Sequence, residues 1–534
     1  MPAQVFHHTY ANGLTLLLER MDHVRSAAVN FLLPAGCVYD PPDKLGVASV
    51  LSEMLTRGAG DRDSRALTLA MDSLGLDHSE SVGQLHLRLW GSTLARNIPQ
   101  ALEIFADILR RPHLPPNELD AVRALALQEL QSLDDEPRAK VMVEFRRRFW
   151  PTPLGQDRRG TLESVARITP ESIRDFYQAR FGPKGLILSV AGNMEWQPLL
   201  EQVEKLFGDW TGEATTPPPL VPPAMGTAHL DKDTTQTQIV IGYPSVPFGD
   251  AEYYAALGAV QVLSGGMGAR LFTEVREKRG LCYAVSANYQ TFKQVAGIVC
   301  YAGTTTERAQ ETLDVTVGEL KRLAEGVTEE EVQRVRAGLK SSAIMQEEST
   351  SSRAGALASD WYYLGRVRST EEIQQAIDAL SPESILAHVK KFPPSDFTIV
   401  TLGKQPLQMP GTAPVVAAPE PAAESAGEPP VQAAAAPPRK VKPKPKPTKA
   451  KSKPKAKVKA ARPKPVVAKA SRSKAKPKAK SARPKPAIAK AAASKSTKPK
   501  AKPAKGKTKP KASMPAKSKV RKNKPKKTAK NRAR

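Results

Sequence analysis

The stretch Thr169-Pro170-Glu171-Ser172-Ile173 returns as Ser381-Pro382-Glu383-Ser384-Ile385, 212 positions further along the chain. A second pair of similar segments, residues 118–124 and 331–337, lies 213 positions apart. Two separate matches at nearly one offset indicate an internal duplication, which is the first feature to look for in a long chain. The chain is therefore expected to contain two halves of similar fold, each of about 200 residues, a normal domain size.

Hydrophobic periodicity predicts both strands and helices within the copies. Strands are expected at 14–18, 27–32 and 85–89, and helices at 45–57, 117–134 and 328–346. Their irregular order favours an α+β fold, with two tandem α/β halves, each an antiparallel sheet with packed helices. The proline-rich stretch 216–223 cannot continue a helix or a central strand, because proline lacks an amide proton and has a fixed φ. We expect a first half at 1–215, a linker at 216–227, a second half at 228–408 and a tail at 409–534.

Charge divides the chain sharply. From Gly411 onward there are 40 lysines and arginines and 3 glutamates, a net +37, whereas the whole chain carries +28, so residues 1–410 carry −9. The tail consists of Lys, Pro and Ala repeats with almost no large apolar residues, and it is expected to be disordered. Dense lysine on a flexible chain binds polyanions by counterion release. DNA is the first expected partner of residues 438–534, RNA or an acidic surface the second, and a purely solubilising role is the alternative.

Several classes of protein are disfavoured by composition. Three scattered cysteines, Cys37, Cys282 and Cys300, do not form a disulfide framework and are expected to be buried. The first residues lack a basic segment followed by an apolar run, and no stretch approaches the ~20 apolar residues of a membrane span. We expect a cytoplasmic bacterial protein that has no membrane partner. The charge of its tail is consistent with association with the nucleoid.

The order of short motifs resembles the pitrilysin/insulinase family of metallopeptidases. The segments that carry the resemblance are Asn12-Gly13-Leu14, 35–40, 45–48, 54–58, Gly268-Ala269-Arg270-Leu271-Phe272 and 276–283. The most similar branch is the mitochondrial processing peptidase-like one, of the inverzincin type, and the tail resembles histone-like tails. The resemblance covers about residues 5–404 and implies two duplicated halves that close like a clam shell.

The metal motif of that family is missing. Members hold zinc with His-x-x-Glu-His on the helix after the Gly-x-Ala segment, and the Glu acts as general base. Here the corresponding positions are Ser49, Ser52 and Glu53, and Glu129 falls where the family's third ligand is expected. Two carboxylates and two hydroxyls suit weak binding of a hard cation at best. No metal site is predicted in this chain, and independent peptidase activity is not expected.

Two histidines outside the motif are alternative candidates for metal ligands. His78 and His86, eight residues apart, could share one face of a strand. No third ligand accompanies them, so we expect polar positions on a half-exposed strand.

The second half keeps two residues that the family uses. Arg276 and Tyr283, seven residues apart, match a pair that reaches toward the substrate carbonyl and stabilises the charge that develops there. The alternative is that Arg276 pairs with a structural carboxylate and Tyr283 packs at a rim. The glycine-rich stretch 264–268 is expected to be either a substrate-facing loop or a simple helix end.

The combination predicts a role. In two-subunit relatives, one chain carries His-x-x-Glu-His and the other carries the Arg/Tyr pair. The resemblance therefore implies a non-catalytic subunit that binds peptide substrate and acts in trans on a homologous partner, with the zinc cofactor in that partner. The alternative is a catalytically inert scaffold or binding protein of the same fold.

Overall fold

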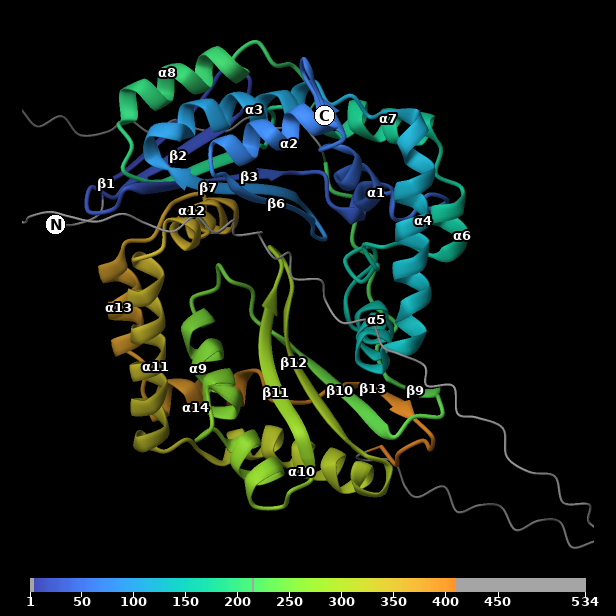
Figure 1. Ribbon diagram of the computed structural model, residues 1–534. Coiled ribbons are helices and arrows are strands. Elements are labelled where there is room, and N and C mark those ends of the chain that lie inside the picture. Colours follow the sequence, from blue (N-terminus) through green and yellow to red (C-terminus); the bar gives the residue numbers. More distant parts are fainter. Residues whose placement is uncertain (1–3, 214–215, 410–534) are drawn as a thin grey trace, which may run out of the picture. The chain divides into compact units, whose positions relative to one another are not determined.

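The computed structural model describes residues 4–213 and 216–409 (Figure 1). The expected tail lies outside the described residues except for Met409, as does the expected nucleic-acid-binding segment 438–534. No helix of the described part is both long and apolar enough to cross a membrane.

The first half is built on a six-stranded sheet with the order β1-β2-β8-β3-β7-β6. Its strands are β1 (Gln4–Thr9), β2 (Thr15–Arg20), β3 (Ser26–Leu33), β6 (Asp77–Val82), β7 (Leu87–Leu94) and β8 (Ile187–Gly192), with the short pair β4 (Gly58–Ala59) and β5 (Arg62–Asp63) outside it. Only β2 and β8 run parallel in the large sheet; its other pairs are antiparallel. All six residues of β8 are buried, which fits a central strand covered on both faces.

Helices cover this sheet and extend from it. They are α1 (Val47–Met54), α2 (Ser64–Ser73), α3 (Ile98–Arg110), α4 (Pro116–Ser132), α5 (Pro137–Phe149), α6 (Leu162–Ala166), α7 (Pro170–Arg180) and α8 (Trp196–Phe207), with short turns η1 (Cys37–Tyr39), η2 (Ala95–Asn97) and η3 (Leu133–Asp135). Helix α3 buries Leu102, Phe105 and Leu109 at three- to four-residue spacing, the pattern of a helix that packs one face on a core.

The second half has a five-stranded sheet with the order β11-β12-β10-β13-β9. Its strands are β9 (Thr227–Asp231), β10 (Gln236–Ser245), β11 (Cys282–Thr291), β12 (Ala296–Thr305) and β13 (Thr398–Gly403). Its helical elements are α9 (Tyr253–Ser264), η4 (Phe272–Glu277), η5 (Thr306–Arg308), α10 (Ala309–Arg322), η6 (Leu323–Glu325), α11 (Glu329–Glu347), α12 (Thr350–Leu364), α13 (Thr370–Asp378) and α14 (Pro382–Lys391).

The two halves repeat one topology. When elements are matched in chain order, the strand series β2-β8-β3-β7-β6 of the first sheet corresponds to β9-β13-β10-β12-β11 of the second. The repeated sequence that opens α7 and α14 forms the same capping box twice, with Thr169 and Ser172 in one copy and Ser381 and Ser384 in the other. These repeated elements account for the similarity between the two segments in the sequence.

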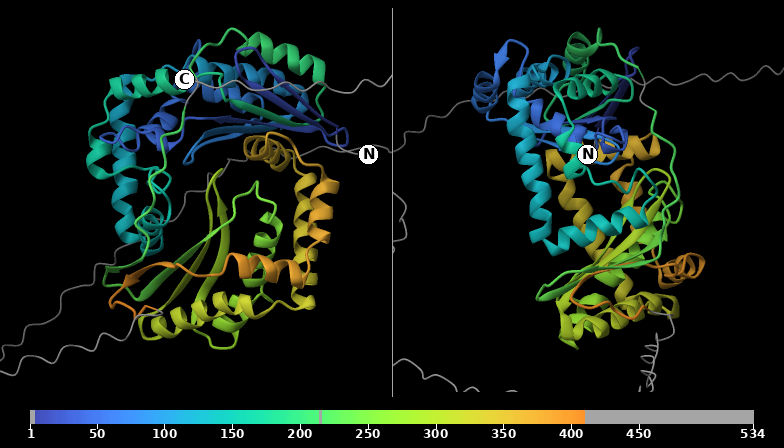
Figure 2. Two further views of the ribbon diagram at one scale, coloured as in Figure 1. Left: turned by 180° about the vertical axis from the view of Figure 1, so that it is seen from behind. Right: turned by 90° about the vertical axis from the view of Figure 1, so that its right-hand side faces the viewer.

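The halves exchange one helix each (Figures 1 and 2). Helix α5 belongs to the first half of the chain but packs against β10 and β13 of the second sheet, whereas α12 packs against β2, β3 and β8 of the first. Glycine makes the α5 contact possible, because a Cβ at Gly242 or Gly297 would come within 2.5 Å of the rings of Phe145 or Phe149. Arg353 of α12 forms a buried ion pair with Glu19 of β2, with 2.9 Å between Nε and Oε1.

Some local expectations need correction. The expected helix 45–57 is shorter, because Gly46 takes a left-handed φ of 93° and the Asp40 carboxylate accepts hydrogen bonds from the amides of Gly46 and Ala48. Leu85 lies in the turn before β7, not in a strand, because the amide of Gly83 bonds the carbonyl of His86. The proline-rich stretch forms no helix, and its Val221 pairs with Thr152 of the first half. The three cysteines are buried and free, as expected.

Candidate functional site

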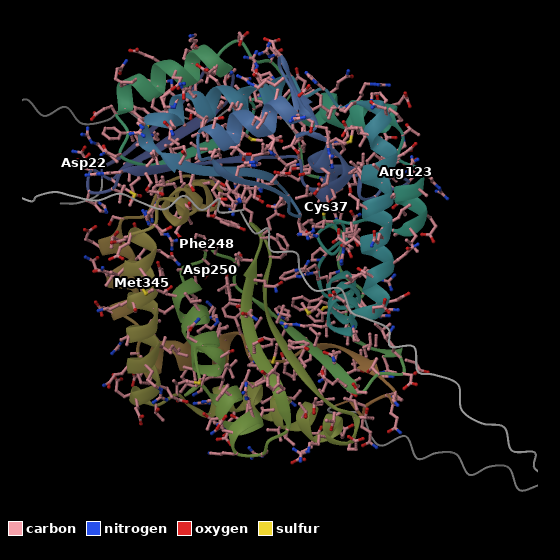
Figure 3. All side chains as sticks on the ribbon, viewed as in Figure 1. Asp22, Cys37, Arg123, Phe248, Asp250 and Met345 are labelled. Carbon is pink, nitrogen blue, oxygen red and sulfur yellow. The ribbon has the colours of Figure 1, made fainter. Side chains whose placement is uncertain are left out.

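The positions that correspond to the family's metal motif meet at one cavity of about 320 Å³ in the first half. Helix α1 contributes Ser49, Ser52 and Glu53, and α4 contributes Glu129. Strand β6 and the loop before α6 complete the walls. Figure 3 marks this region by Arg123 on α4 and by Cys37 in η1, which contacts α1. The sequence comparison that matched Glu129 to a ligand position therefore selected a residue of the same cavity.

The loop before α6 brings two arginines to this cavity. Arg158 and Arg159 line it, and the loop lies so close to the start of α1 that a Cβ on Gly46 would be 2.5 Å from the carbonyl oxygen of Arg159. The hydroxyl of Ser49 donates a hydrogen bond to the carbonyl of Arg158 at 2.7 Å. The guanidinium of Arg159 lies 3.9 Å from the Glu129 carboxylate and 2.7 Å from that of Asp157. A fixed cation thus stands beside the carboxylate that corresponds to a metal ligand.

Two carboxylates of the cavity influence each other, Glu53 of α1 and Glu80 of β6. Burial raises the pKa of Glu80 on β6, and the neighbouring Glu53 carboxylate raises it further. His78 lowers it partly. The pair Glu53 and Glu80 is thus a site of like-charge repulsion that a bound cationic group would relieve.

The residues present do not fit a zinc ion. Zinc sites in proteins use imidazole, thiolate and carboxylate ligands, and here Ser49 and Ser52 offer neutral hydroxyls, of which the first is already bonded. Arg159 adds positive charge next to Glu129. Within residues 4–213 and 216–409, no group of three or more His, Cys, Asp or Glu side chains is placed to hold a metal ion.

Arg276 and Tyr283 come together in the second half. The guanidinium of Arg276, on η4, donates a hydrogen bond to the carbonyl of Tyr283 at 2.9 Å and lies 4.8 Å from the ring centroid of Phe272 and 5.2 Å from that of Tyr283. It forms no ion pair with any carboxylate of the described chain. The side chain of Tyr283 is 82% exposed. The pair is thus held by backbone and ring contacts while its polar groups stay accessible.

A bulge in β11 explains the exposure of Tyr283. Cys282 pairs with Thr304 and Ala284 with Gly303, so Tyr283 is an extra residue in the ladder. Bulges re-aim side chains and are common next to functional sites. The other end of the strand faces the first half, where Phe292 contacts Trp150 with 5.0 Å between ring centroids. At ~3.3 Å per residue, Tyr283 lies roughly 26 Å along the strand from Thr291.

The two sets of candidate residues therefore form two separate sites. Ser49, Ser52, Glu53 and Glu129 line the first-half cavity, and the pair on η4 and β11 is not among its lining residues.

The histidine alternative is corrected. His78 lies on β6, where it pairs with Gly91, and His86 lies in the turn before β7, so the two are on different segments of a hairpin. The chain reverses near Gly83, which the periodicity did not show. The stretch 264–268 follows the end of α9 and lines a small cavity with Arg334 of α11.

Three functional candidates were missed in the sequence. Glu80, Arg158 and Arg159 belong to no motif, and they reach the cavity only because β6 and the loop before α6 pack beside α1. The run of polar residues along 77–81 was the only signal, and it marks an exposed segment without indicating a cavity.

Two family models match the chain. "Insulinase (Peptidase family M16)" matches residues 9–161, and "Peptidase M16 inactive domain" matches residues 167–339. Similar curated proteins are an "Uncharacterized zinc protease" of Rickettsia bellii, 27% identical over 73% of this chain and 96% of its own length, and one of Bacillus subtilis, 25% identical over 74% and 97%.

Solved structures share the fold. A peptidase M16 inactive domain from Pseudomonas fluorescens aligns with a TM-score of 0.71 and 21% identity, over 76% of this chain and 99% of its own. A protease from Helicobacter pylori aligns with a TM-score of 0.70 and 20% identity, over 76% and 100%. The expected α+β architecture of two sheet-and-helix halves is confirmed by these similarities and by the repeated strand order.

Proposed function

Because the chain belongs to the insulinase family, peptidase family M16, we propose that it is the non-catalytic subunit of a heteromeric zinc metallopeptidase. A homologous partner would carry His-x-x-Glu-His and the zinc ion. This chain would bind peptide substrate and supply Arg276 and Tyr283 to the shared active site.

The observation that carries the proposal is the contrast between the two sites. The cavity of the first half has two serines and an arginine where a zinc site needs imidazoles and open carboxylates. In the second half, the Tyr283 side chain is exposed, and the half-buried Arg276 has no carboxylate that would hold it in a structural role. A cation without a carboxylate partner, beside an exposed phenol, suits a surface that another chain completes.

The chemistry of the pair suits the hydrolysis of an amide. Negative charge develops on the carbonyl oxygen as the bond is attacked, and a fixed cation with a nearby O–H donor stabilises it. The contacts of Arg276 with the Tyr283 carbonyl and two rings hold the guanidinium in place before substrate arrives. Such preorganisation reduces the reorganisation needed during the reaction.

The first half offers a way to hold the peptide. β6 is the last strand in the order of the first sheet, and its residues 80–82 line the cavity. An extended peptide can pair with such a free edge through main-chain hydrogen bonds. The carboxylates of Glu53 and Glu80 would then favour a basic side chain of that peptide.

The reconstitution of activity tests the proposal. The experiment mixes this chain with an M16 chain of the same genome that carries His-x-x-Glu-His and follows cleavage of a fluorogenic peptide library. We expect cleavage by the mixture and much less by either chain alone. Cleavage by the partner alone at the rate of the mixture, or none in a stable complex, would support the inert scaffold instead.

The tail carries a second proposal, nucleic-acid binding by residues 438–534, which would place the protein in the cytoplasm near the nucleoid. Its support is the charge of +37 after residue 410. Deletion of 411–534 should abolish salt-sensitive retention on DNA, and equal retention of the shortened chain would exclude this role.

A further inference from the structure

A second cavity, of about 310 Å³, lies where the two halves meet. The first half contributes His86 and Arg88 from the turn before β7 and from β7 itself, the β11–β12 turn contributes Phe292, and α12 contributes Tyr362. Figure 3 marks the neighbourhood by Phe248, whose ring lies 5.1 Å from that of Tyr363, another lining residue. This cavity shares only Ser81 with the cavity at α1.

Three of the polar side chains in this cavity have no hydrogen-bond partner among the described residues. The guanidinium of Arg88, the imidazole of His86 and the hydroxyl of Tyr362 form no hydrogen bond or ion pair with any residue of the described ranges. His86 touches Tyr362 edge to face, with 4.4 Å between ring centroids. These three side chains are half-buried, so their polar groups remain available to a ligand that enters the space.

The charge of the cavity is positive. No Asp or Glu is among its described lining residues, and Arg88 has no counter-ion. Lys293 adds a second cation, with its Nζ 5.4 Å from the ring centroid of Tyr362. This region contrasts with residues 1–410 as a whole, which carry −9. An anion is therefore the ligand class that the charge favours.

The remaining lining mixes polar side chains with apolar and aromatic ones. Leu85, Phe292 and the ring of Tyr362 face the same space, and its volume is at the lower end of the range of small-molecule sites, ~300–1,000 Å³. A single guanidinium presents a planar fork that matches one carboxylate. A phosphate group is usually met by several cations in direct contact, whereas the described lining holds one arginine, Arg88, beside Leu85, Phe292 and Tyr362, which suits a carboxylate that carries an apolar group.

We propose that this cavity binds a carboxylate attached to an apolar or aromatic group, with Arg88 holding the carboxylate and the rings of Phe292 and Tyr362 holding the apolar part. The C-terminus of a peptide and a free small organic acid both have this chemistry. Burial and the charge of Arg88 lower the pKa of His86 to about 4, so its imidazole is neutral near pH 7 and can donate one hydrogen bond. The site needs neither a partner chain nor peptidase activity.

Calorimetric titration of the full chain with N-acetyl-phenylalanine tests the proposal. We expect saturable binding with a Kd on the order of 1 mM, from typical ligand efficiencies for a ligand of this size. N-acetyl-phenylalaninamide, which lacks the charge, should bind about tenfold more weakly or less. Absence of saturable binding, or equal binding of acid and amide, would overturn the proposal.

Variants distinguish anion binding in the cavity from anion binding by the lysine-rich tail, which attracts any anion. Arg88→Gln should weaken binding about tenfold or more, and Arg88→Lys, which keeps the charge and loses the fork, should weaken it less. Arg65→Gln, on the exposed face of α2, removes one charge far from the cavity residues and should leave binding unchanged. Equal affinity of Arg88→Gln and the unchanged chain would place the anion on the tail and refute the site.

A pair of peptides shows whether the bound carboxylate is a peptide C-terminus or a free small acid. A hexapeptide that ends in phenylalanine, with a free or an amidated C-terminus, is titrated in the same way. Tighter binding of the free-acid peptide than of N-acetyl-phenylalanine identifies a peptide terminus, and binding of the small acid alone identifies a small-molecule ligand. Circular dichroism melting of each variant confirms that the fold is intact. Failure of these titrations leaves the reconstitution assay unaffected, so the two proposals fail separately.

Discussion

The two halves of this molecule share one strand order and differ in their chemistry. In the first half, the positions that correspond to a metal motif lie on α1 and α4, and they hold serines and carboxylates beside Arg159. In the second half, Arg276 lies on η4 without a structural carboxylate, and Tyr283 lies exposed on a bulge of β11. The positions of the metal motif and the Arg/Tyr pair thus lie on different elements of one repeated fold.

The difference teaches that the chemistry of the cavity is separate from the packing of the core. Ser49 and Glu53 face a cavity, whereas Leu51 and Met54 of the same helix are almost fully buried. Burial of apolar side chains supplies most of the stability of such a helix. A substitution at Ser49 or Glu53 is therefore expected to leave the packing of α1 on the core unchanged.

The largest expected effect concerns the tie between the halves. Arg353→Ala would leave Glu19 buried and unpaired in the first sheet, which costs ~3–5 kcal/mol of unfolding free energy. Chemical denaturation followed by tryptophan fluorescence measures it. The control is Arg366→Ala, because its pair with Glu372 is exposed and worth ~0–1 kcal/mol. Equal stability of the two variants would show that the exchanged helix α12 does not tie the halves together.

The second effect is on catalysis in the reconstituted complex. Arg276→Ala should lower kcat by about 100- to 1,000-fold, the usual cost of removing one donor to a developing oxyanion. Its matched control is Arg279→Ala, since Arg279 is a nearby surface arginine that is already paired with Glu274. If both variants cleave the peptide at equal rates, the asymmetry between the halves has no catalytic meaning and Arg276 is structural.

Sequence patterns predicted the fold better than they predicted the cavities. The repeats at 169 and 381 predicted the duplication, since both copies open a helix with the same capping box. The motif alignment placed Ser49 and Glu129 together, and both positions belong to helices that pack against each other, α1 and α4. A repeated capping box and an ordered set of motifs can both be recognised in the sequence alone.

Other features depend on packing and left no trace in one sequence. The exchange of α5 and α12 is invisible in periodicity, because an amphipathic helix shows that it packs but not on which sheet. Arg159, Glu80 and Arg88 reach cavities only through loops and strand edges that lie far from them in the chain. The turn at Gly83 also moved His86 off the strand on which alternation had placed it.

The third effect tests whether the first half can regain a metal site. The triple variant Ser49→His, Ser52→Glu, Glu53→His restores His-x-x-Glu-His, but Arg159 would remain 3.9 Å from Glu129. We expect the addition of Arg159→Ala to tighten zinc binding by about tenfold or more, because a cation beside a ligand carboxylate opposes the metal. Competition with a chromophoric chelator measures the affinity.

Arg167→Ala added to the same triple variant is the control, since Arg167 lies outside the cavity residues. Equal zinc affinity with Arg159→Ala and Arg167→Ala would mean that the arginine does not oppose metal binding. The loss of ligands alone would then separate the first half from a zinc-bearing relative.

The smallest effect concerns the repulsion between Glu53 and Glu80. The folded pKa of Glu80 is raised by burial and by Glu53, so the folded state binds the proton more tightly than the unfolded state. The contribution of Glu80 to stability is therefore fully present below its pKa in the unfolded state, and it is lost as the pH rises through its pKa in the folded state. Glu80→Gln should stabilise the protein at pH 7 by a few tenths of a kcal/mol, the scale of a partly exposed charge interaction.

The pH dependence distinguishes this repulsion from a packing effect. The gain from Glu80→Gln should vanish below about pH 4, where the carboxyl is protonated in both states. Glu103→Gln, an exposed position of α3, should show no such dependence. A gain that persists at low pH would mean that Glu80 is destabilising through its shape and not its charge. The two carboxylates would then give no reason to expect a basic peptide side chain at this cavity, although the edge of β6 could still bind the peptide backbone.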